Sequence, residues 1–283
     1  MALKLLRRTW RWWQRWRRQV PDIPTPLWNA VLAQHPFVAC RPAAELITLR
    51  WLCAHFLADK EFHGTRGLVV SDTVALTVAM QACLPLVHWG RAGLRWYDDF
   101  VGIVIHPDTV VARREVVDEA GVVHHYKEAL AGEAMAGGPV MLVWSQVIGD
   151  GQDATQGHNL VIHEFAHKLD MRYKRSHEMA NGCPRLSAGW LGLTPRQAQR
   201  HWQTHWQQSY DAFCEAVEMA QRFGAPTPWL DAYGAQAPAE FFAVCCEAYF
   251  VNRPRFGQEF PALLPLLDAF FGRPDDINGA PAP

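Results

Sequence analysis

Residues 159–170 read NLVIHEFAHKLD, and this stretch decides the fold class of the chain. Its apolar positions follow one another without glycine or proline, which predicts a buried helix of about 10–12 residues. At its centre His163, Glu164 and His167 form an H-E-x-x-H pattern. Because residues four apart on a helix are neighbours, with Cβ atoms about 5–6 Å apart, the two imidazoles can bind one metal ion.

The glutamate of this pattern has a chemical role in such a site. A zinc ion bound by His163 and His167 lowers the pKa of its water toward ~7, and Glu164 can accept the proton as general base. In a chain of this composition, chance produces the pattern on the order of 0.03 times. The alternative interpretation is a pair of core histidines on an apolar helix, without a metal.

A catalytic zinc ion requires a third protein ligand and leaves a fourth position to water. The candidate is Glu240, in the apolar segment 238–250, where Pro238 fits the first turn of a second helix. Glu240 and Glu247 are two helical turns apart on one face, and carboxylates in so apolar a helix are costly unless they are paired or bind a metal. Ordinary ion pairs at a helix surface are the alternative.

Asp170 is the competing candidate for the third ligand, since it follows His167 by three residues. A short carboxylate on the same helix would compress the tetrahedral geometry, so Asp170 is predicted to support the ligands or the helix end. Glu247 is predicted to have a similar supporting role, accepting the free N–H of a ligand histidine.

Three segments of the chain, 163–170, 231–233 and 240–244, resemble the Mlc titration factor A family. That family consists of bacterial zinc peptidases whose active site is related to the anthrax lethal factor protease domain. The resemblance extends over about residues 27–271. It implies an α+β, zincin-like metallopeptidase domain.

The resemblance also implies roles for individual residues. It implies that one Zn²⁺ per chain is bound by His163, His167 and Glu240. Glu164 is then the general base, and Tyr233 donates a hydrogen bond to the oxyanion of the tetrahedral intermediate.

Two features depart from the pattern expected of zinc peptidases. Lys168 places a charge where the metal helix usually has an uncharged residue, although the titration factors share it. The segment 179–200 is longer than usual, and within it residues 182–194 are predicted to form a loop over the substrate cleft.

Two functions of different classes follow from the resemblance. The first is a zinc peptidase that hydrolyses peptide bonds of a peptide or protein substrate in an aminopeptidase-like manner. Substitution of Glu164 tests this function most directly. The second is a protein-binding regulator that sequesters a glucose-responsive transcriptional repressor, with peptidase activity secondary.

Composition restricts the other classes of function. Hydrophobic residues make up 49% of the chain and charged residues 19%, values typical of a globular protein. A formal net charge of −1 leaves no overall electrostatic footprint for nucleic acid, so direct nucleic-acid binding is not expected. Seven cysteines without a C-x-x-C pattern predict reduced thiols in the cytoplasm. No signal peptide is recognisable, and no apolar run reaches the ~18–20 residues of a membrane span.

The chain is expected to consist of an N-terminal segment and linker (1–26), the metallopeptidase domain (27–271) and a disordered tail (272–283). Residues 1–19 are basic and rich in tryptophan. As a helix they would have an arginine face and an apolar face, which is typical of contact with an anionic membrane surface or an acidic partner. The alternative is that the tryptophans pack on the protein's own domain.

Short apolar runs typical of strands precede the metal helix, at 101–105, 109–117, 121–126 and 139–144. They predict a small, mostly antiparallel sheet. In zinc peptidases an edge strand ahead of the metal helix pairs with the extended substrate backbone. Residues 140–144 are the candidate for that strand, and a wholly internal strand is the alternative.

Further helices are predicted at 43–60, 71–83 and 195–223 from apolar spacing and cap residues. The last contains a second histidine pair four residues apart, His201 and His205. It lacks a glutamate after the first histidine, and we interpret it as a solvated or packed helix face.

Overall fold

The computed structural model describes residues 20, 22–108, 110–117, 123–130, 132–134, 137–150, 155–172 and 180–272. Segment 1–19, for which membrane contact is predicted, lies outside the described residues, as does the tail after Gly272.

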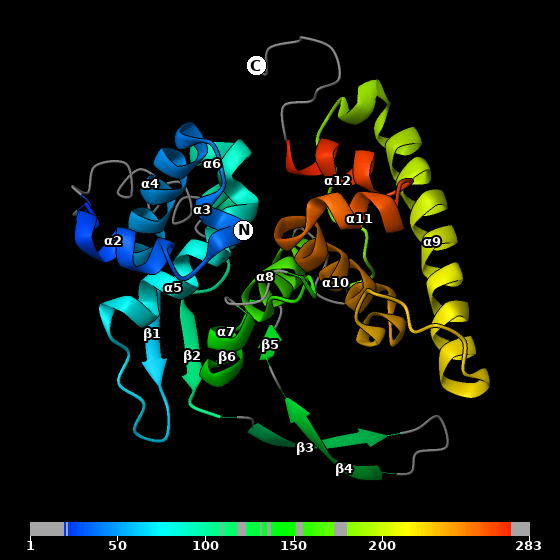
Figure 1. The fold of residues 1–283 in the computed structure, drawn as a ribbon, viewed down its shortest axis with the longest axis horizontal. Helices are drawn as coiled ribbons and strands as arrows, with labels where there is room; N and C mark the ends of the chain where they lie inside the picture. Colours follow the sequence, from blue (N-terminus) through cyan, green and yellow to red (C-terminus); the bar gives the residue numbers. More distant parts are fainter. Residues whose placement is uncertain are drawn as a thin grey trace, which may run out of the picture.

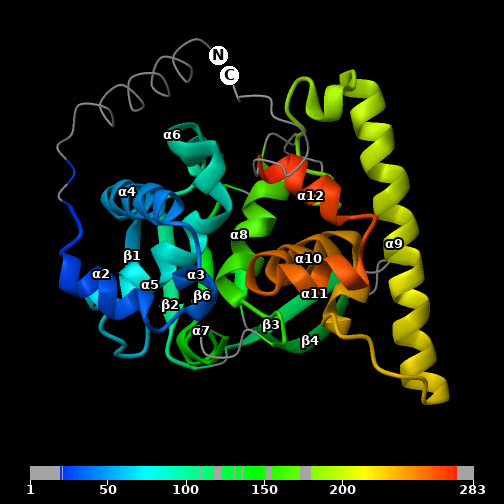
Figure 2. The same ribbon diagram turned by 45° about the horizontal axis from the view of Figure 1, so that its top comes forward.

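The protein is mostly helical, and one central helix lies between two groups of helices (Figures 1 and 2). The first group is α2 (Thr25–Leu32), α3 (Pro36–Ala39), α4 (Ala43–Asp59), α5 (Asp72–Cys83) and α6 (Gly90–Gly93), with the 3₁₀ helices η1 (Leu84–Trp89) and η2 (Leu94–Tyr97). After α7 (Trp144–Asp150) comes the central helix α8 (Leu160–Met171). The second group is η3 (Trp190–Gly192), α9 (Pro195–Phe223), η4 (Ala232–Ala235), α10 (Pro238–Val251), α11 (Arg253–Glu259) and α12 (Leu264–Phe271).

The predicted helices are confirmed, and their ends have physical causes. Helix α5 follows Ser71, whose hydroxyl oxygen accepts a hydrogen bond from the Val74 N–H at 3.3 Å. Helix α9 begins with a capping box between Thr194 and Gln197 and ends before Gly224, which has a φ of 69°.

The main sheet has the order β1-β2-β6-β5, formed by β1 (Glu61–Gly64), β2 (Gly102–His106), β6 (Val140–Val143) and β5 (Gly132–Ala134). The pairs β1–β2 and β2–β6 are parallel, and only β5–β6 is antiparallel. A separate antiparallel hairpin consists of β3 (Val110–Val117) and β4 (Val123–Leu130).

The prediction of a mostly antiparallel sheet is therefore wrong. Parallel neighbours need a crossover connection, and the helical segment from α5 to η2 supplies it between β1 and β2. Strand β1 was not predicted, because its sequence, EFHG, has no strand pattern. The proposed edge strand is also wrong: β6 lies between β2 and β5, so the sheet edge near α8 is β5.

Helix α8 is held in the core by aromatic packing. The Phe165 ring centroid lies 5.0 Å from that of Tyr97, 5.7 Å from Phe56 and 5.9 Å from Phe100, in edge or tilted geometry. On its other side α8 packs against α10. The H-E-x-x-H pattern is therefore carried by a helix that is fixed on both sides.

One helical stretch, Asp72–Tyr97, has the length and composition of a membrane span, with a mean hydropathy of 1.3. This differs from the expectation that no apolar run is long enough. Since 72% of its most apolar 18-residue window is buried inside the protein, this stretch has the character of core helices. No disulfide joins any of the seven cysteines, all of which lie within the described residues.

Replacing Asp268 by alanine should lower the free energy of unfolding by about 2–3 kcal/mol. The buried Asp268 carboxylate accepts hydrogen bonds from the Tyr249 hydroxyl at 2.7 Å and from Arg253 Nε at 3.2 Å, which joins α10 to α12. Without it, the buried Tyr249 hydroxyl loses its acceptor. Urea denaturation measures the change, and Glu259→Ala, in an exposed pair with Arg255 at 3.6 Å, should cost less than about 1 kcal/mol. Equal losses in the two variants would contradict the assignment.

Candidate metal centre

The N-terminus of α8 is fixed by polar groups from three other parts of the chain. Asn159 caps the helix, its Oδ1 accepting from the Ile162 N–H at 2.9 Å. Its own backbone N–H donates to Glu247 at 2.5 Å, and its side-chain amide donates to Gln81 at 2.6 Å. The Leu160 N–H donates to Asp150 at 2.8 Å. These bonds hold the first turn of α8 against α5, α7 and α10.

Three side-chain atoms from α8 and α10 converge on one point. Nε2 of His163 lies 3.2 Å from Nε2 of His167, and Oε2 of Glu240 lies 3.1 Å from each of them. The structure thus brings together the two histidines of the H-E-x-x-H pattern and a glutamate more than seventy positions later. Among the described residues this is the one group of three or more His, Cys, Asp or Glu side chains close enough to hold a metal ion.

The triangle of donor atoms fits a zinc ion. Ligand atoms about 2.0–2.1 Å from a tetrahedral zinc ion lie about 3.3–3.4 Å from one another. The observed separations of 3.1–3.2 Å are close to that value. Two imidazoles and one carboxylate are also the donor types found in catalytic zinc sites.

The charges around the triangle favour a cation. Burial lowers the pKa of His163, but the carboxylates of Glu247, Glu240 and Glu164 outweigh it and hold that pKa well above its usual value. Burial likewise acts to raise the pKa of Glu240, yet hydrogen bonds from His163 and His167 bring it to about 2. Positive charge between these groups is therefore stabilised, and a divalent cation could supply it in place of a proton.

Glu164 has a different environment from Glu240. Its side chain is 4% exposed, and Oε2 is buried without a hydrogen-bond partner within the described structure. Burial raises its pKa to about 7, and the positive charges of His163 and His167 only partly oppose the shift. A buried carboxylate oxygen without a hydrogen-bond partner is unusual in a folded protein.

Tyr233 lies in η4, close to His163 of α8. Its ring centroid is 5.8 Å from that of His163, and the side chain is 40% exposed. Its backbone N–H donates to the Asp231 carboxylate at 2.9 Å, which caps η4 and fixes the turn.

Comparison with known proteins identifies the family. The family model for glucose-regulated metallo-peptidases M90 matches residues 10–272, nearly the whole chain. The chain belongs to the M90 metallopeptidase family. Three relatives that cover most of it are each called Mlc titration factor A. The one from Escherichia fergusonii is 30% identical over 259 residues, covering 91% of this chain and 90% of that protein.

The other two relatives of this M90 chain are similarly distant. The protein from Klebsiella pneumoniae strain 342 is 33% identical over 236 residues, 83% of this chain and 82% of its own length. The protein from Salmonella schwarzengrund is 31% identical over 262 residues, 93% of this chain and 90% of its own length.

The two carboxylates predicted to support the metal ligands of this M90 chain, Glu247 and Asp170, contact different parts of the protein. Oε1 of Glu247 is 2.7 Å from Nδ1 of His163, so it can fix the orientation of the ring. Asp170 is fully buried and lies away from the triangle, where it accepts a hydrogen bond from the Gly182 N–H at 2.8 Å. Glu247 therefore orients a donor histidine, whereas Asp170 anchors the loop that follows.

Sequence reasoning missed Asn159, Gln81 and Asp150 at the start of α8. An asparagine directly before an apolar helical run is a cap signal that could have identified the first. No sequence signal places Gln81 or Asp150 here, because both contacts depend on how distant elements pack.

The other histidines do not take part in the donor triangle. His201 and His205 lie side by side on α9, with ring centroids 4.5 Å apart, and no third donor joins them within the described residues. His158 lies 3.9 Å from the Asp231 carboxylate, at the exposed side of the η4 turn.

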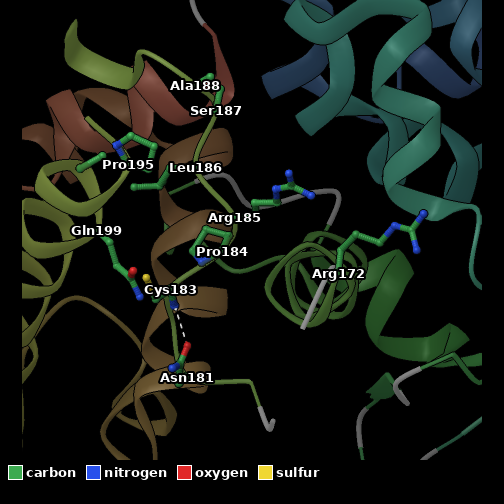
Figure 3. Close-up of a pocket in the computed structure, with 11 residues that line it drawn as sticks. Arg172, Asn181, Cys183, Pro184, Arg185, Leu186, Ser187, Ala188, Pro195 and Gln199 are labelled. Atoms are coloured by element: carbon green, nitrogen blue, oxygen red, sulfur yellow. Dashed lines mark hydrogen bonds between the residues drawn. The ribbon is translucent and has the colours of Figure 1, made fainter. Parts of the chain in front are cut away.

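The predicted cleft loop lines a pocket of about 440 Å³ at the C-terminal end of the metal helix (Figure 3). Figure 3 shows Arg172 of the α8 end and Arg185 of the loop on one side, with Gln199 of α9 on the other. Gly182 anchors the loop, because its N–H donates to Asp170 and its carbonyl accepts from Trp202 Nε1 at 2.9 Å. The three donor residues of the metal centre do not line this pocket.

Proposed function

We propose that the protein is a zinc-dependent peptidase of zincin-like architecture that hydrolyses peptide bonds, in an aminopeptidase-like manner. The observation that supports it most strongly is the triangle of His163, His167 and Glu240, with the buried Glu164 carboxylate next to it. Membership of the M90 family supports the same class of reaction.

The three donor residues would hold one Zn²⁺, which when bound supplies a Lewis acid and lowers the pKa of water toward ~7. Glu164 would accept the proton of the attacking water and pass it to the leaving amine. Burial raises the pKa of the Glu164 carboxyl, the direction that lets it hold the proton before passing it on. Glu247 would keep the His163 ring in one orientation through Nδ1.

Strand β5 is the proposed binding edge for the substrate backbone. It is one of the two edge strands of the four-stranded sheet, and it packs beside α8 (Figure 1). An extended peptide could add to this edge through main-chain hydrogen bonds, bringing a scissile bond to the metal centre.

Metal dependence tests the proposal directly. Purified protein should contain about one zinc ion per chain by elemental analysis, and chelation should abolish hydrolysis of an alanine 4-nitroanilide. Stoichiometric Zn²⁺ should restore it, whereas Mg²⁺ should not, because the donor set has two imidazoles. Full hydrolysis by metal-free protein would refute the proposal.

Replacing Tyr233 by phenylalanine should lower kcat by on the order of 10²-fold with little change in stability, because one donor to the oxyanion is lost. Steady-state kinetics and thermal unfolding measure the two effects. Tyr249→Phe serves as the control: it removes a buried hydroxyl bonded to Asp268, so it should reduce stability and leave kcat unchanged. An unchanged rate in Tyr233→Phe would exclude Tyr233 from the reaction.

A second candidate function rests on the name of the relatives, Mlc titration factor A. It is the binding of a transcriptional repressor, with peptidase activity secondary. Pull-down of the purified repressor by Glu164→Gln separates the two functions, because this variant should keep the fold and lose hydrolysis. Retained binding would support the regulatory role, and absence of binding in both the parent and the variant would exclude it.

A further inference from the structure

Lys168 is a buried cation on the metal helix, directly after His167. It is 0% exposed, its Nζ donates to the carbonyl oxygen of Gly138 at 2.7 Å, and the ammonium lies 4.4 Å from the Phe100 ring centroid. Lysine is rarely buried completely, because removing an ammonium from water is costly unless specific partners stabilise it. A methionine would fill a similar volume without that cost, so packing alone does not account for a lysine at this position.

The carbonyl that Lys168 holds belongs to the turn between β5 and β6. Gly138 follows Gly137, which has a φ of 67°, and the two strands pair antiparallel with Ala134 opposite Val140. The ammonium therefore ties the metal helix to the hairpin whose outer strand is the edge of the sheet (Figure 1).

Lys168 also lies on the same face of α8 as Glu164. Residues four apart on a helix are neighbours, and Lys168 follows Glu164 by four positions. Because α8 packs directly against β5 and β6, the hairpin held by Lys168 lies on the side of the helix that presents the proposed base.

We infer that Lys168 is a positioning residue: by holding the Gly138 carbonyl, it sets the spacing between the metal helix and edge strand β5, and so determines the binding of substrates long enough to pair with that strand. This inference rests on the proposed peptidase function. Ligands should therefore fall into two groups. The affinity of a ligand that contacts only the metal should not depend on Lys168, whereas the affinity of a ligand that also pairs with β5 should.

The protein contains a matched control for this role. Lys60, at the end of α4, is 7% exposed, and its Nζ lies 4.1 Å from the centroid of the same Phe100 ring. It donates to the carbonyl oxygens of Tyr97 at 2.6 Å and Phe100 at 2.7 Å. Lys60 thus resembles Lys168 in burial, charge and contact with backbone carbonyls, although it also donates to the Asp59 carboxylate at 3.1 Å. Its carbonyl partners lie outside the β5–β6 hairpin.

The test compares Lys168→Met with Lys60→Met in zinc-loaded protein. Calorimetry gives the dissociation constants of acetohydroxamate, which reaches only the metal, and of trialanine hydroxamate, which also has a peptide backbone. In the parent the peptide should bind more tightly. The gain is the ratio of the acetohydroxamate to the trialanine hydroxamate dissociation constant. Lys168→Met should lower this ratio about tenfold, the loss expected for one or two main-chain hydrogen bonds. Lys60→Met should leave the ratio within about twofold of the parent value.

Hydrogen exchange supplies a readout that needs neither metal nor substrate. Backbone amides of β5 and β6 should exchange faster in Lys168→Met than in Lys60→Met at matched global stability. Equal exchange in the two variants, or an unchanged gain for trialanine hydroxamate in Lys168→Met, would overturn the inference. If acetohydroxamate failed to bind the parent, the proposed metal function would fail instead, while the exchange comparison would still decide whether Lys168 holds the hairpin.

Discussion

Replacing Glu164 by glutamine should leave one zinc ion per chain and lower peptide hydrolysis by about 10³-fold, within the range for loss of a general base. Glutamine has the same shape as glutamate but cannot accept the proton of the attacking water. The donor atoms of the metal centre come from His163, His167 and Glu240, so the change removes no ligand. The buried oxygen Oε2 of Glu164 has no hydrogen-bond partner in the described structure, so its removal breaks no structural contact.

Stability in this variant should not fall, because the amide removes a charge from a buried side chain whose Oε2 has no hydrogen-bond partner in the described structure. Elemental analysis, steady-state kinetics and thermal unfolding together give the three quantities. Glu259→Gln is the matched control, since it makes the same chemical change in an exposed ion pair with Arg255. Parent-level hydrolysis by Glu164→Gln would show that another group removes the proton.

Replacing His163 by alanine should abolish stoichiometric zinc binding and hydrolysis together. The variant removes one of three donor atoms and leaves the Glu247 carboxylate without the Nδ1 partner it has at 2.7 Å. Loss of a group that only supports a ligand already lowers metal affinity about 10–100-fold, so loss of a ligand should lower it by more than about 10²-fold. Elemental analysis after dialysis measures the metal, and circular dichroism measures the remaining helix content.

His201→Ala provides the control for this variant. His201 and His205 have the same spacing on α9 as His163 and His167 on α8, but no carboxylate completes that pair within the described residues. Zinc content should therefore be unchanged when His201 is removed. If zinc content fell in His201→Ala and persisted in His163→Ala, the metal would be bound on α9 and not on α8.

Local features of the sequence predicted a large part of this structure. The ends of α9 follow from Pro195 and Gly224, and the start of α5 follows from Ser71, because caps act within one turn of the chain. The pairing of His163 with His167 is equally local, since helical spacing places them on one face. Glu240 was identified by chemistry, as a carboxylate in an apolar helix that needs a partner, and by family resemblance.

Tertiary structure alone decided the features that depend on distant contacts. The direction of the sheet was mispredicted because strand patterns do not encode which end of the sheet a crossover returns to. For the same reason the edge strand near α8 is β5 and not β6. The partners of Glu247, Asp170 and Lys168 join segments that the sequence keeps far apart. Spacing along a helix is a local property, whereas the choice of hydrogen-bond partner for a buried group depends on how whole elements pack around it.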